Sequence, residues 1–230
     1  GEPALPAGRY LKYAIGEIVL VVIGILIALS INNWNQQNQK RDLELINLKA
    51  IKNNLTADLE LEIKPGIIYY ANSKKAEKDI LNNHQNSQGL SNDSLTSYYK
   101  IWLRRDWRFV FNSAAFDNLK SIGIDIISND SLRTSVSSIY NHLYPNIIQD
   151  NVSSINYFEQ QILPKLNDST SQFNVAFSNN ELEFLNNNKQ LKNGFIYMTK
   201  LRDYLSDNIL PETQTMVEDV IDAINKELEQ

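Results

Sequence analysis

Cysteine is absent from the 230-residue chain, and histidine occurs only twice. The first absence excludes disulfides, thiolate metal ligands and cysteine nucleophiles. His84 lies in an Asn-rich stretch and His142 beside Tyr140 and Tyr144, and neither has a second histidine at metal-ligand spacing. Glycine-rich phosphate loops, nucleophile elbows and HExxH motifs are also missing from the sequence. We therefore expect no cofactor, no metal and no enzymatic activity, and assign both histidines to the surface or the core.

Positive charge is also in short supply, with 22 Lys and Arg against 27 Asp and Glu and a net charge of −5 at pH 7. The few basic clusters are interleaved with acids, so no basic field is available to hold a phosphate backbone. Nucleic acid is therefore excluded as a partner. No motif identifies a small-molecule ligand.

One long apolar run, YAIGEIVLVVIGILIALSI, extends from Tyr13 to Ile31. As a helix it would be roughly 28 Å long, against a hydrocarbon thickness of about 30 Å. A signal peptide is the main alternative, but the run lacks a small-x-small cleavage site and passes into further helical sequence. Tyr10 and Trp34 place aromatic rings near both headgroup levels. The run therefore predicts a retained transmembrane helix with the lipid bilayer as its partner.

The charges that flank this run predict its direction. Arg9 and Lys12 precede it directly, whereas Lys40 and Arg41 follow only after a neutral Asn/Gln stretch. Because positive charge favours the cytoplasmic side, we expect the N-terminus in the cytoplasm and the rest outside it. The chain starts at Gly1 and not at Met, so we also expect residues to be missing upstream.

Glu17 is the unusual residue of the run, since a carboxylate at mid-membrane costs about 2.5 to 3.5 kcal/mol. Glu17 and Gly24 are seven residues apart, and Gly24 with Ala28 forms a small-xxx-small pair. This stripe predicts association between transmembrane helices. Two alternatives stay open: Glu17 reaches the interface or meets Lys12 or Tyr13, or it serves as a proton or ion relay.

Beyond the run, apolar residues recur at three- and four-residue steps from Leu48 to Ile63, which predicts a continuing helix. We expect Pro65 and Gly66 to end this helix, and Pro145 and Pro164 to end later ones.

Further apolar stripes, among them one starting near Pro211, predict more helices, and no alternating run demands a sheet. The predicted class is all-α, with one transmembrane helix continuing into a helical bundle or array. The expected organisation is a cytoplasmic segment 1–12, a transmembrane helix 13–31, a membrane-proximal stalk helix 32–63 and a helical soluble domain 64–230.

The densest unusual patch combines aromatic and guanidinium groups that can clamp an anion, a lipid headgroup or an acidic partner. Its residues are Trp102, Arg104, Arg105, Trp107 and Arg108. The alternative is a helix end with a buried tryptophan and paired surface arginines.

Two strings resemble a family of single-pass membrane proteins from Gram-negative, Bacteroidetes-type bacteria that is known only as a domain of unknown function. They are YLKYAIGEIVLVVIGILIALSINNWN at 10–35 and FVFNSAAFDNLKSIGIDIISNDSLRTSVSSIYN at 109–141. Where the family often has a small residue after Ser121, this chain has Ile122. The resemblance implies an inner-membrane anchor with a periplasmic domain, and it brings no catalytic residues, cofactor or substrate.

Three Asp-Ser motifs resemble the O-glycosylation motif of exported proteins in this class of bacteria. They place the candidate sites at Ser94, Ser131 and Ser169, the last followed by Thr170 where the motif has an apolar residue. Asp and Ser are also ordinary N-cap residues, so helix capping is the alternative.

These observations favour a non-enzymatic, membrane-anchored periplasmic interaction domain, either a homo-oligomer or an accessory subunit bound to another membrane protein. Two alternatives remain: a ligand-sensing domain that signals through a partner, and an ion-coupled subunit in which Glu17 titrates.

Overall fold

The computed structural model describes residues 7–86, 90–103, 106–170 and 176–229. Helices dominate this part of the chain and no strand occurs in it, which confirms the predicted all-α class. The chain divides into two compact units, Gly1–Asn47 and Leu48–Gln230. We call the second unit the helical domain.

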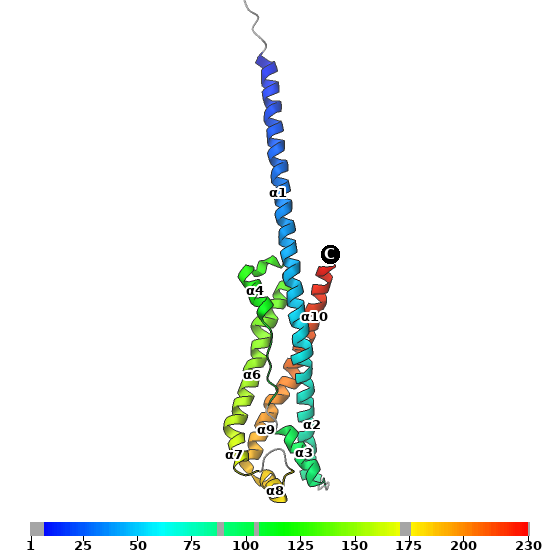
Figure 1. Ribbon diagram of the computed structural model, residues 1–230, viewed down its shortest axis with the longest axis vertical. Helices are drawn as coiled ribbons and strands as arrows, with labels where there is room; N and C mark the ends of the chain where they lie inside the picture. Colours follow the sequence, from blue (N-terminus) through cyan, green and yellow to red (C-terminus); the bar gives the residue numbers. More distant parts are fainter. Residues whose placement is uncertain (1–6, 87–89, 104–105, 171–175, 230) are drawn as a thin grey trace, which may run out of the picture. The chain divides into compact units, whose positions relative to one another are not determined.

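The helices follow one another along the chain, and several are joined directly through π-turns (Figure 1). The α-helices are α1 Ala7–Asp58, α2 Lys64–Asn86, α3 Asn92–Trp102, α4 Ala114–Ile122, α5 Asp130–Ser138, α6 Tyr144–Tyr157, α7 Leu163–Asn167, α8 Asn179–Asn187, α9 Lys189–Tyr204 and α10 Leu210–Leu228. The π-turns are η1 Leu59–Ile63, η3 Ile139–Leu143, η4 Phe158–Ile162 and η5 Leu205–Ile209, and η2 is a 3₁₀ turn at Ile124–Ile126.

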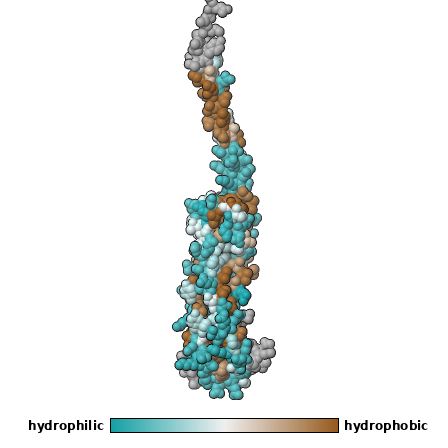
Figure 2. All heavy atoms as spheres, turned by 90° about the vertical axis from the view of Figure 1, so that its left-hand side faces the viewer, coloured by the Kyte–Doolittle hydropathy of each residue, from teal (hydrophilic) through white to brown (hydrophobic). Residues whose placement is uncertain are grey.

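The first unit consists of the N-terminal part of α1, and its apolar residues face outward. Ile15, Leu20 and Ile31 are all more than half exposed. Figure 2 shows these hydrophobic residues as a continuous band on the helix. By length and composition, this is the one helix in the described ranges that can cross a membrane.

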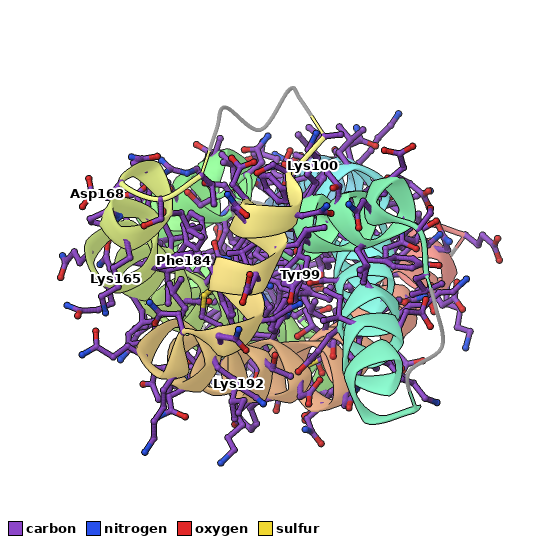
Figure 3. All side chains as sticks on the ribbon, turned by 90° about the horizontal axis from the view of Figure 1, so that it is seen from below. Tyr99, Lys100, Lys165, Asp168, Phe184 and Lys192 are labelled. Carbon is purple, nitrogen blue, oxygen red and sulfur yellow. The ribbon has the colours of Figure 1, made fainter. Side chains whose placement is uncertain are left out.

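The helical domain is built from long helices that lie side by side (Figure 1). At one end, Leu48, Ile51 and Leu55 of α1 are fully buried against residues of α4, α5 and α10. A second cluster at the other end joins α3, α7, α8 and α9. Figure 3 shows α8 crossing this end, with Lys165 and Lys192 pointing outward.

Proline does not end the long helices, contrary to the prediction at Pro65, Pro145 and Pro164, and the chain also enters α10 at Pro211 without a break. Each of these prolines follows a π-turn whose last residue lies two positions before it. The residue that precedes the proline donates its N–H to the fifth residue back, as Lys64 does to Leu59. Each π-turn adds one residue to a helical turn. In a regular α-helix the proline ring would collide with the carbonyl group of the preceding turn, and that carbonyl would have no N–H donor. The added residue shifts the helical register and avoids this collision. Each predicted break is therefore a local widening of a continuous helix.

Helix ends away from proline follow the expected capping chemistry. Ser91 accepts a hydrogen bond from the Ser94 N–H at the start of α3, and Asn129 accepts one from Leu132 at the start of α5. Gly123, with φ of 115°, ends α4 in a backbone conformation that favours glycine. The chain then forms the 3₁₀ turn η2, and Ile127 follows it in an extended conformation.

Candidate functional site

A non-helical stretch, residues 106–113, lies among the helices of the domain, and we call it the crossing segment (Figure 1). Its backbone groups bond to side chains of α1 and η1. The Asp58 carboxylate accepts the Asn112 N–H at 3.0 Å, and Asn54 donates to the Asn112 carbonyl at 3.3 Å. Glu62 accepts the Val110 N–H at 3.3 Å. Three polar side chains at four-residue spacing on one helix face thus provide hydrogen-bond partners for backbone groups of the crossing segment, which is not part of a sheet.

Asp58 is buried within this arrangement, and burial raises the pKa of its carboxyl group to about 6. The Asn112 N–H and the Tyr144 hydroxyl lower that pKa, whereas the negative charge of Glu62 raises it. Burial also raises the pKa values of Tyr140 and Tyr144. A carboxylate and two phenols therefore lie together away from water.

The first residue of the crossing segment carries a buried ion pair. Arg202 Nε of α9 lies 2.6 Å from Asp106 Oδ1, with side-chain exposures of 5% and 0%. The guanidinium also donates to the Trp102 carbonyl at 2.8 Å and to Ser73 Oγ at 3.1 Å, and Ser154 donates to the other Asp106 oxygen. Five residues from separate parts of the chain are thus joined through one buried pair.

Aromatic rings continue this arrangement along the crossing segment. Phe109 stacks between Tyr70 and Phe111, at centroid distances of 6.5 and 5.7 Å. Phe111 stacks on Tyr144 at 3.8 Å, with 8° between the ring planes. Alternate side chains are therefore buried, and Val110 between them is 66% exposed.

This centre holds the domain together and offers little room for a ligand. The cavity beside Arg202 has a volume of about 10 Å³, enough for one water molecule. Within the described ranges, no three His, Asp or Glu side chains are placed to hold a metal ion.

A more open groove lies between α5 and α10 and has a volume of about 540 Å³. Its lining includes the apolar residues Leu132, Met216 and Val220 and the carboxylates of Glu212 and Asp219. The volume falls in the range of small-molecule sites, about 300 to 1,000 Å³. The groove is therefore large enough to receive a small molecule.

The predicted aromatic and arginine patch is divided in the structure. Trp102 is buried at the end of α3 and contacts Phe195 at 4.5 Å between ring centroids. Trp107 is partly buried and donates to Glu62, whereas Arg108 is exposed. Arg104 and Arg105 lie outside the described residues, as does the side chain of His84. The described tryptophans thus have structural contacts, and the anion site stays a prediction.

The other predicted site residues lie on helices or beside helix ends. Glu17, Gly24 and Ala28 are exposed on α1. Ser131 is exposed in the first turn of α5 and also lines the groove, while Ser94 and Ser169 are half-buried. Glycosylation at these positions stays a prediction.

The sequence reasoning missed the buried polar residues, above all Asp58, Asp106 and Arg202. One signal was present for Asp58, because it lies three residues after Leu55, on the apolar stripe of α1. No comparable signal paired Asp106 with Arg202, since 96 residues separate them.

Comparison with known families supplies the identification. The model of a family described as "Family of unknown function (DUF6090)" matches residues 17–174, more than half of the chain. The chain belongs to this family. The match includes Glu17, Gly24 and the crossing segment, whereas Arg202 and the α10 side of the groove lie beyond it. Neither the curated proteins nor the solved structures contain a match to this DUF6090 chain.

Proposed function

We propose that the protein is a membrane-anchored, non-enzymatic interaction domain. Helix 13–31 crosses the inner membrane with its N-terminus in the cytoplasm, and the helical domain lies in the periplasm. The observation that carries the proposal is the exposure of the apolar residues in the first part of α1. A run of this length is stable when lipid or other apolar helices surround it.

Glu17, Gly24 and Ala28 support assembly through this helix. At 100° per residue, the three positions lie within about 40° of one another on the helix surface. A Cβ built at Gly24 would meet nothing within 4 Å apart from the adjacent backbone of its own helix. Any loss of assembly on enlarging Gly24 would therefore come from a neighbouring helix, which makes this glycine a clean test.

We expect Gly24→Leu to weaken self-association in mild detergent or nanodiscs at least tenfold, because a large side chain separates closely packed helix backbones. Gly16→Leu is the matched control. Gly16 also has open space around it, but it lies about 100° from Glu17 on the helix. Analytical ultracentrifugation of the full chain measures the effect. A strict monomer before any substitution, or equal losses in both variants, contradicts assembly through this stripe.

Glu17→Gln separates assembly from ion coupling in the same experiment. The glutamine keeps the size and hydrogen-bonding capacity of Glu17 but does not titrate. Assembly that is retained in Glu17→Gln and lost in Gly24→Leu supports packing. A loss confined to Glu17→Gln favours the ion-coupled alternative.

The groove between α5 and α10 favours ligand sensing as a second candidate function. Its apolar lining and two carboxylates suit a small molecule with an apolar body and a positive charge. We expect a thermal-shift screen of small amphiphilic amines to find compounds that raise the unfolding temperature. Asp219→Asn should reduce the shift, and Glu183→Gln, a change outside the groove, should not. A screen without stabilising compounds counts against this function.

A further inference from the structure

Five buried side-chain oxygen atoms of the helical domain have no hydrogen-bond partner among the described residues, and three of the five lie around one carboxyl group. These three are Asp58 Oδ2, Tyr140 Oη and Tyr144 Oη. The exposures of the three residues are 3%, 8% and 3%. Buried polar atoms are nearly always hydrogen-bonded, so three in one neighbourhood need an explanation.

Among the described groups that act on Asp58, none carries a positive charge. The crossing segment presents the Asn112 N–H, η3 and α6 present Tyr140 and Tyr144, and Glu62 adds a second negative charge from η1. Asp117 of α4 acts on Tyr140, and Glu218 of α10, which packs on η1, acts on Lys64. The ionised carboxylate is therefore buried beside neutral and negative groups.

We propose that Asp58, Tyr140 and Tyr144 form a proton-binding site, and that proton uptake in mild acid tightens α1 and η1 against η3 and the crossing segment. The proton comes from solvent and binds Asp58 Oδ2. Proton binding removes the buried negative charge and leaves Asp58 Oδ2 as a neutral hydroxyl group. Asp58 Oδ1 keeps the Asn112 N–H throughout, so the backbone contact is preserved in both states.

The shift of the Asp58 pKa sets the direction and the range of the effect. The pKa is about 6 in the folded protein, against 3.8 for an unperturbed aspartate. Because the folded state binds the proton more tightly, this contribution to stability is full below pH 3.8 and is lost as the pH rises through 6. Between pH 7 and pH 5, the unfolding equilibrium constant should fall about tenfold. This response does not depend on assembly in the membrane.

Urea unfolding of the full chain in detergent at pH 5, 6 and 7, followed by tryptophan fluorescence, tests the site. The wild-type protein should show the tenfold change. Asp58→Asn should remove most of it, because the amide bonds to Asn112 without titrating. Asp125→Asn, which replaces an exposed acid, should retain it. A full response in Asp58→Asn overturns the proposal.

A direct titration keeps the test decisive if a variant fails to fold. The ¹³C shift of the Asp58 carboxyl in the wild-type chain should titrate near pH 6. In Tyr144→Phe the midpoint should rise, because the Tyr144 hydroxyl lowers the Asp58 pKa. The phenylalanine keeps the stack on Phe111. A wild-type midpoint near 3.8, or one unmoved in Tyr144→Phe, overturns the proposal.

Discussion

Arg202→Met is expected to destabilise the helical domain by about 3 to 5 kcal/mol, because it leaves the Asp106 carboxylate buried without its cation. Asp106 is the first residue of the crossing segment, and its side chain is fully buried. The substitution also removes donors from Ser73 and from the Trp102 carbonyl. Urea unfolding of the full chain in detergent measures the loss.

Lys74→Met is the matched control for this prediction. Lys74 pairs with Asp203 at 3.2 Å and with Asp207, but its side chain is 41% exposed. Exposed ion pairs contribute about 0 to 1 kcal/mol, so the control should lose little. A similar loss of stability in both variants would mean that burial does not make the Arg202–Asp106 pair more important for stability than the exposed Lys74 pairs.

A double variant separates the ion pair from the packing around it. Asp106→Leu combined with Arg202→Met removes both charges, and such replacements are often neutral or stabilising. We expect the double variant to be more stable than Arg202→Met alone. The loss of stability in the double variant is compared with the sum of the losses in Asp106→Leu alone and Arg202→Met alone. If the loss equals this sum, the two side chains act independently and the coupling inferred from their 2.6 Å contact is wrong.

Phe109→Ala is the second large effect, with an expected loss of about 3 to 5 kcal/mol from the removal of a buried ring. The Phe109 side chain is 5% exposed and lies against Gly66 as well as Tyr70 and Phe111. A Cβ built on Gly66 would come within 2.7 Å of the ring, so the helix backbone there forms one wall of its pocket.

Val110→Ala provides the control at the adjacent position. Val110 is 66% exposed, so its truncation should cost less than about 0.5 kcal/mol. Hydrogen exchange adds a second measurement, because Phe109→Ala should speed exchange of the Val110 and Asn112 amides, which bond to Glu62 and Asp58. Equal losses of stability in Phe109→Ala and Val110→Ala would mean that burial of the Phe109 side chain does not hold the crossing segment in place.

The crossing segment shows what the sequence could not predict about this region. The predicted patch, which includes Trp107 and Arg108, was inferred because its arginines and tryptophans are close together in the chain. In the structure, extended backbone sends neighbouring side chains to opposite sides, so Phe109 is buried while Arg108 is exposed. The backbone adopts this form because Asp58 and Glu62, about 50 residues earlier, accept its N–H groups. The conformation of the crossing segment therefore depends on residues distant in the sequence and cannot be predicted from its own residues.

The long helices show a similar limit at their prolines. Pro65 and Pro145 are strong helix breakers in isolation, and the sequence alone favours a break at each of them. In the folded domain, Ile63 and Tyr70 are buried on the two sides of Pro65, and Tyr144 and Ile147 on the two sides of Pro145. Burial on both sides of a proline favours a continuous helix, and the π-turn accommodates the ring.

The sequence by itself determined the all-α class, the apolar run of α1 and the continuing helical stripe from Leu48 to Ile63. These features depend on composition and on residues at most a few positions apart, so local chemistry is sufficient. Only the tertiary structure decided that Asp106 pairs with Arg202 and that Asp58 lies with Tyr140 and Tyr144. Such pairs form where distant segments pack together, and burial then sets both their strength and their pKa values.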